Sequence, residues 1–138
     1  RSISTDPVRT PKNKPKLHNA IKTASAHHRG RRTRNRGSDK ITANLVETIL
    51  ADMDLAKGDE VSVLVNGLGA TPKEELYVMY RKVHQILTGR GIKIHRPYIG
   101  EYATSMEMAG ASVTLCKLDA ELKTLLDAPA STPFVELV

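Results

Sequence analysis

Two short stretches contain residue types that could bind or modify a small molecule. The first, HHRGRRTRNRG at residues 27–37, joins two adjacent histidines to a run of arginines, the residue type that binds phosphates and RNA. The second, NGLGATP at residues 66–72, sets glycines between a strand-like run and a helical pattern, where backbone N–H groups can meet an anion. The first lacks an aromatic residue for base stacking, and the second lacks the G-K-[ST] ending of a P-loop. An unstructured linker and a tight turn are the simpler interpretations.

The remaining histidines are expected to be structural. His84 falls beside the apolar stripe of a predicted helix, His95 ends a predicted strand, and His18 lies in an irregular region. No Cys, Asp or Glu joins the His27–His28 pair at ligand spacing, so no metal site is predicted. No Ser-His-Asp or Cys-His arrangement can be argued from these positions either.

The net charge of +6 is distributed unevenly along the chain. Residues 1–37 hold eleven Lys or Arg against the single acid Asp6, whereas residues 38–138 hold ten against fourteen acids. Such a change of sign predicts a boundary, and the polar, proline-containing first part predicts loop or disorder. The lone Cys116 excludes a disulfide framework, and no apolar run approaches the ~20 residues that cross a bilayer. A cytoplasmic protein without membrane contact is expected.

The rest of the chain alternates between helical and strand-like patterns, which predicts an α/β fold: a small mixed sheet with flanking helices. We expect the first pair of strands to be parallel, and one face or edge of the sheet to rely on a missing partner. The expected elements are a helix over 39–55, a strand over 60–66, a helix opened by a Thr71 capping box and closed at Gly89–Gly91, a strand over 92–95, a loop over 96–110, a strand over 111–118 and a short helix capped by Asp119.

Three stretches together resemble a known family. LVNGLGATPKEELYVMYRKV, then RPYIGEYATSMEMAGASVTLCKLDAEL, then LLDAPASTP follow the order and spacing of the C-terminal part of the dihydroxyacetone kinase substrate-binding subunit. The resemblance covers roughly residues 38–134. TSMEMAG before an apolar strand, together with LLDAP near the end, makes it specific.

The resemblance implies a subunit, usually a homodimer, that holds dihydroxyacetone through a covalent hemiaminal on a histidine. It implies no cofactor on this chain, because in that family ATP or ADP with magnesium sits on a separate nucleotide-binding subunit or domain. That partner phosphorylates the substrate with ATP or through a relay from phosphoenolpyruvate. The position of the tether falls on His28 or His27.

The family's glycine-rich frame around that histidine, G-I-H-G-E-P-G, is replaced here by the cationic SAHHRGRRTRNRG. We therefore expect a basic irregular segment or aberrant junction over 1–37, whether a diverged linker, a rearrangement or an out-of-frame translation, and an α/β domain over 38–138. The family's N-terminal substrate domain has no counterpart, which predicts that the chain alone is inactive as a kinase. Two alternatives stay open: a small α/β module whose basic arm binds RNA or another polyanion, and a structural or dimerising remnant.

Overall fold

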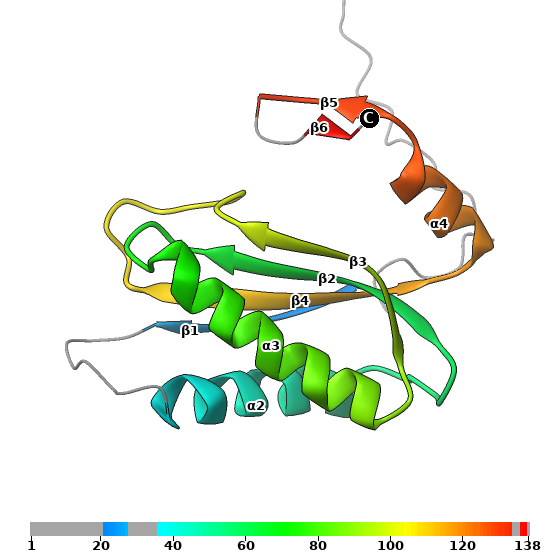
Figure 1. Cartoon of the computed structure of the whole chain (residues 1–138), viewed down its shortest axis with the longest axis horizontal. Coiled ribbons are helices and arrows are strands. Elements are labelled where there is room, and N and C mark those ends of the chain that lie inside the picture. Colours follow the sequence, from blue (N-terminus) through cyan, green and yellow to red (C-terminus); the bar gives the residue numbers. More distant parts are fainter. Residues whose placement is uncertain (1–20, 28–35, 134–135, 138) are drawn as a thin grey trace, which may run out of the picture.

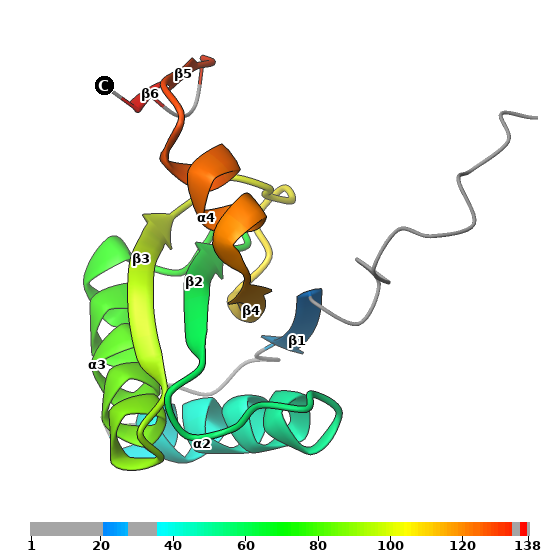
Figure 2. The same cartoon turned by 90° about the vertical axis from the view of Figure 1, so that its right-hand side faces the viewer.

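The protein is described by a computed structural model that covers residues 21–27, 36–133 and 136–137 of the 138-residue chain. A four-stranded mixed sheet in the order β1-β4-β2-β3 forms its centre. Helices α2 and α3 lie against one face of this sheet, and the short helix α4 lies at the opposite face (Figures 1 and 2). The elements are β1 (Ile21–His27), α2 (Arg36–Ala51), β2 (Glu60–Gly67), α3 (Lys73–Gly89), β3 (Lys93–Gly100), β4 (Gly110–Leu118), α4 (Ala120–Asp127), β5 (Ala130–Ser131) and β6 (Glu136–Leu137).

The core lies between the sheet and the helices α2 and α3. Alternate residues of a strand point to the same face, so Val61, Val63 and Val65 of β2 all reach this layer and are fully buried. Beside β2, strand β4 contributes Val113 and Leu115 in the same way. The helices supply Leu45, Val46, Ile49 and Met53 from α2 and its C-terminal end, and Leu76, Met79, Val83 and Leu87 from α3. This apolar layer fixes the sheet, and with it the loops at both ends of the strands.

The prediction of a small mixed sheet with flanking helices is confirmed. Strands β2 and β3 run parallel, as expected from a right-handed crossover through α3, whereas β4 is antiparallel to both β1 and β2. After α4 the chain forms a short antiparallel pair of β5 with β6.

The expectation of irregular structure throughout residues 1–37 is wrong for two segments. Residues 21–27 form β1, which pairs with β4 along its whole length, and α2 begins at Arg36 rather than at Ser38 or Asp39. The apolar pattern of β1 is weak because the face it turns to the helices carries Lys22 and the small Ala24 and Ala26, of which only the alanines pack against the core. Residues 1–20 and 28–35, including most of the arginine cluster, lie outside the described residues.

Strand β3 is also longer than predicted. A loop was expected from residue 96, yet the strand continues through Arg96 and Pro97 to Gly100. Proline cannot donate to a ladder and is tolerated on edge strands, and β3 is the outer strand of this sheet. A bulge between the pairs Val61↔Ile94 and Ser62↔Arg96 leaves His95 without a partner in the ladder.

Candidate functional site

The candidate site lies where strands β1, β2 and β3 end. All three run in one direction, because β4 is antiparallel to β1 and β2 and because β2 and β3 are parallel. Their carboxyl ends therefore meet at one edge of the sheet, at His27, Gly67 and Gly100 (Figure 1). Ligands of α/β sheets are commonly bound outside such an edge. We call this region the carboxyl edge.

His27 is the last residue of β1 and pairs in register with Gly110, the first residue of β4. The backbone of this predicted tether residue thus stands at the carboxyl edge, beside the end of the 101–109 loop. His28, the first-choice tether, lies outside the described residues but follows His27 directly. The placement of His27 at this edge could not be predicted, since residues 21–27 were expected to be irregular.

The glycine turn that follows β2 is joined closely to the 101–109 loop. The Leu68 N–H donates to Gly110 O at 3.1 Å, and the Ala70 N–H donates to Met108 O at 3.2 Å. In return, Ser105 N–H donates to Leu68 O at 3.3 Å. The amides of Leu68 and Ala70 are therefore engaged within the protein, which supports the interpretation of NGLGATP as a structural turn over that of an anion site.

Gly69 allows this close approach. Its φ of +115° lies in a region that residues with a Cβ rarely adopt, and an added Cβ would stand 2.2 Å from Ser105 O. A side chain at this position would separate the turn from the loop.

Asn66 links the end of β2 to the beginning of the same loop. Its Oδ1 accepts from Tyr102 N–H at 2.8 Å and from Ala103 N–H at 3.0 Å, and its Nδ2 donates to Ala103 O at 2.7 Å. The side chain is only 3% exposed, so these bonds replace the water it has lost. Asn66 opens the NGLGATP stretch, and no pattern in the sequence indicates this role.

Thr71 behaves differently from the predicted helix cap. Helix α3 begins at Lys73, the residue before it is Pro72, and no side chain caps its first turn. The Thr71 hydroxyl instead donates to Gly110 O at 2.8 Å and accepts from Gly110 N–H at 3.0 Å. The capping-box prediction is wrong because this hydroxyl is taken by a backbone segment far along the chain.

Tyrosines line the β3 side of the carboxyl edge. The rings of Tyr98 and Tyr102 meet edge to face, with centroids 6.3 Å apart. Burial raises the pKa of the Tyr102 hydroxyl, with contributions from Tyr98 and Tyr77, so this hydroxyl stays protonated at neutral pH. Beyond Tyr102 the loop turns outward, where Met106 is 96% exposed and Glu107 adopts a φ of 53°. The TSMEMAG segment is thus bonded to the glycine turn through Ser105 and Met108, and its tip at Met106 is exposed.

The other two described histidines lie away from the carboxyl edge. His84 is exposed on α3, where its ring contacts that of Tyr80. His95 bonds through Nε2 to both carboxylate oxygens of Asp127 on α4, at 2.9 and 3.0 Å. The hydrogen bond from His95 is the main cause that holds the pKa of Asp127 below its ordinary value. Both histidines have the structural roles expected of them.

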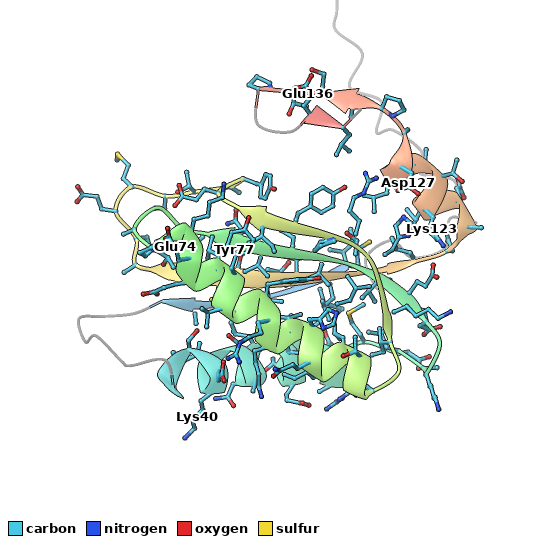
Figure 3. All side chains as sticks on the ribbon, in the orientation of Figure 1. Lys40, Glu74, Tyr77, Lys123, Asp127 and Glu136 are labelled. Carbon is cyan, nitrogen blue, oxygen red and sulfur yellow. The ribbon has the colours of Figure 1, made fainter. Side chains whose placement is uncertain are left out.

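At the other edge of the sheet, away from the carboxyl edge, a cavity of about 580 Å³ lies between α4, the beginning of β2 and the end of β4. Glu60 pairs there with Lys123 and Asp59 with Lys117 (Figure 3 labels Lys123). Asp127 bonds to His95 and pairs with Arg96, and Asp119 caps the first turn of α4. The pairs Glu60–Lys123 and Arg96–Asp127 join α4 to the sheet, and α4 buries none of its residues fully. Within the described ranges, no group of three or more His, Cys, Asp or Glu is placed to hold a metal ion. The described helices are also too short or too polar to cross a membrane.

The arrangement defines a class of protein: an α/β domain whose glycine turn and following loop together shape the carboxyl edge of a mixed sheet. Comparison with known families identifies the domain. Residues 26–134 match the Dak1 domain, and the chain belongs to this family. The match begins before the histidine pair and includes both His27 and His28.

The curated relatives are kinase subunits. The chain is 45% identical over 107 residues to the dihydroxyacetone-binding subunit DhaK of a PTS-dependent dihydroxyacetone kinase from Listeria innocua serovar 6a; this covers 78% of the chain and 32% of the relative. It is 48% identical over 79 residues to the dihydroxyacetone-binding subunit of the PEP-dependent kinase of Escherichia coli K12, covering 57% and 22%. The chain therefore spans about a third or less of the length of these relatives.

A solved structure agrees with the fold. A protein described under the words "Regulation of the DHA operon of Lactococcus lactis" superposes with a TM-score of 0.76 at 26% identity, over 88% of this chain and 44% of that one. The comparisons give no support to the alternative of an RNA-binding module. The recognition of the family from its motifs is confirmed.

Proposed function

We propose that this chain is the substrate-holding part of a dihydroxyacetone kinase and that it binds dihydroxyacetone covalently at the carboxyl edge. The observation that carries the proposal is the position of His27 at the end of β1, beside the loop that the NGLGATP turn anchors. The family match supports it, because the two relatives from Listeria innocua and Escherichia coli are dihydroxyacetone-binding subunits. His28, one residue further, is the alternative tether.

The covalent step is an addition that needs no co-reactant. A neutral imidazole nitrogen attacks the ketone carbon, a C–N bond forms, and the electrons of the C=O π bond move to the oxygen. The proton lost from the imidazole ring is taken up by that oxygen, which gives a hemiaminal with no leaving group. Such a tether turns the positioning of a small, flexible ketone into an intramolecular problem.

Phosphoryl transfer requires a partner. We assign the nucleotide and its magnesium to a separate subunit or domain, because phosphoryl transfer needs charge stabilisation at the phosphates and the relatives are named as the dihydroxyacetone-binding subunits of their kinases. The donor is ATP or a relay from phosphoenolpyruvate. The chain corresponds to a third or less of the relatives' length, so the isolated chain is expected to hold substrate without phosphorylating it.

Carbon–nitrogen coupling tests the capture directly. Dihydroxyacetone labelled with ¹³C at the ketone carbon is mixed with protein whose histidines carry ¹⁵N, and the bound carbon is observed by NMR. A tetrahedral carbon with a one-bond coupling to nitrogen is expected for the wild type and lost in one of His27→Ala and His28→Ala. His84→Ala, which changes an exposed histidine on α3, is the matched control and keeps the signal. A coupling that survives both tether variants, or is absent from the wild type, contradicts the proposal.

A further inference from the structure

We infer that Thr71 is a positioning residue for the end of β1, and so for the backbone of His27, its last residue. The inference rests on the proposed function, because it matters for substrate capture only if the tether is at the end of β1. The bonds between Thr71 and Gly110 are present in the structure in either case. The Thr71 hydroxyl holds both polar backbone groups of Gly110, and Gly110 is the register partner of His27. The side chain that looked like a helix cap thus reaches the strand on which the proposed tether rests.

The ladder between β2 and β4 shows what Thr71 replaces. The last register pair of these strands is Gly67↔Ala111, and the Leu68 N–H continues the ladder by donating to Gly110 O. In an antiparallel ladder the next step would return the Gly110 N–H to Leu68 O. Here the Gly110 N–H goes to Thr71 Oγ1 instead.

Because the Gly110 N–H bonds to Thr71 Oγ1, the Leu68 carbonyl is left available for another donor. Leu68 O accepts from Ser105 N–H, which draws the 101–109 loop onto the turn. Thr71 therefore does two things at once: it completes the bonding of Gly110, and it releases the acceptor that anchors the loop. The start of β4 and the loop above it are fixed by the same hydroxyl.

The same geometry explains why β1 depends on this contact. Both polar backbone groups of Gly110 face the turn, so Gly110 exchanges no ladder bond with His27 on its other side. His27 and Gly110 thus form a non-hydrogen-bonded pair, beside the register pair Ala26↔Ala111. A shift of Gly110 moves its neighbour Ala111 and, through that pair, the end of β1.

The chemistry of a hydroxyl makes the role specific. It donates and accepts through one oxygen, as Gly110 requires, and serine retains this ability whereas valine, of nearly the same shape, does not. Thr71→Val should therefore leave the Gly110 N–H without an acceptor, while Gly110 O keeps only its bond from Leu68 N–H. Thr71→Ser should keep both Thr71 bonds. Ser62→Ala is the matched control: it removes a hydroxyl of the same sheet that donates to Arg96 O at 3.0 Å, away from the carboxyl edge.

Two readouts test the inference on the full chain. The first is NMR of the folded protein: amide hydrogen exchange at Gly110 and the imidazole signals of His27. We expect Thr71→Val to speed exchange at Gly110 by about tenfold or more and to shift the His27 signals, because a buried N–H loses its acceptor. Exchange at Val113 in the middle of β4 should stay unchanged. Thr71→Ser and Ser62→Ala should resemble the wild type at both positions.

The second readout is the fraction of protein that carries the carbon–nitrogen adduct, which should fall in Thr71→Val and be restored in Thr71→Ser. Unchanged exchange and unchanged His27 signals in Thr71→Val would overturn the inference, as would a serine variant that behaves like the valine one. If Ser62→Ala lowers the adduct fraction equally, general stability rather than positioning is responsible. A wild type without adduct refutes the proposed function, while the exchange and His27 signals still decide the role of Thr71.

Discussion

Replacement of Gly69 by alanine should be among the most damaging single changes in the chain. Two costs combine at this position. A φ of +115° strains any residue with a Cβ by about 1–3 kcal/mol. The added Cβ would also stand 2.2 Å from Ser105 O and 3.1 Å from Thr104 Oγ1, so the loop must move, at a further cost of about 1–3 kcal/mol. The expected loss of about 2–6 kcal/mol is a large share of the ~5–15 kcal/mol typical of a domain.

Gly58 offers a control that separates the two costs. Its φ of +97° is also in the strained region, but an added Cβ would meet nothing within 4 Å. Gly58→Ala should therefore cost the strain alone, about 1–3 kcal/mol. Urea unfolding of the wild type and both variants, with slopes compared, measures the difference. Equal losses in Gly58→Ala and Gly69→Ala would refute the claim that close packing of the turn on the loop requires a glycine at position 69.

Three further predictions concern the core, the last helix and its anchor. Leu76→Ala should lower the free energy of unfolding by about 2–5 kcal/mol in the same urea assay, because Leu76 is fully buried under the sheet; a loss below 1 kcal/mol would contradict its place in the core. Asp119→Ala should cost about 1 kcal/mol, since the Asp119 carboxylate accepts a backbone N–H in the first turn of α4, and Asp119→Asn should recover most of it; equal losses would argue against the cap. The folded pKa of Asp127 lies below its ordinary value of 3.8, so its pairing with His95 stabilises the fold above that pH and is lost as pH falls through the folded pKa. A ¹³C titration of the Asp127 carboxyl should show this midpoint moving up toward 3.8 in His95→Ala, and an unchanged midpoint would exclude His95 as the main cause.

The central elements of the fold could be predicted because their patterns are strong. β2 is a nearly continuous β-branched run, and the leucines and valines of α3 recur at helical spacing. The Asp119 cap was also predicted correctly, since it depends on residues three positions apart. In each case the signal is local and the burial is large.

The carboxyl edge could not be predicted in the same way, because its contacts join residues far apart in sequence. β1 presents small alanines inward, so it lacks the apolar alternation that indicates a strand. Thr71 and Asn66 each have a simple local use, in a cap or a turn, yet their side chains bond to Gly110 and to the loop after β3. Only the tertiary arrangement shows which of these competing hydrogen bonds is made.

Native intact mass of the full chain after incubation with dihydroxyacetone tests the central claim most directly. The wild type should gain the mass of one dihydroxyacetone, and a double variant, His27→Ala with His28→Ala, should gain none. The unliganded mass also checks that the whole chain, its cationic segment included, has the composition of the printed sequence. A wild type that gains no mass, or a double variant that gains as much as the wild type, would contradict the account of the carboxyl edge as the place where the substrate is held.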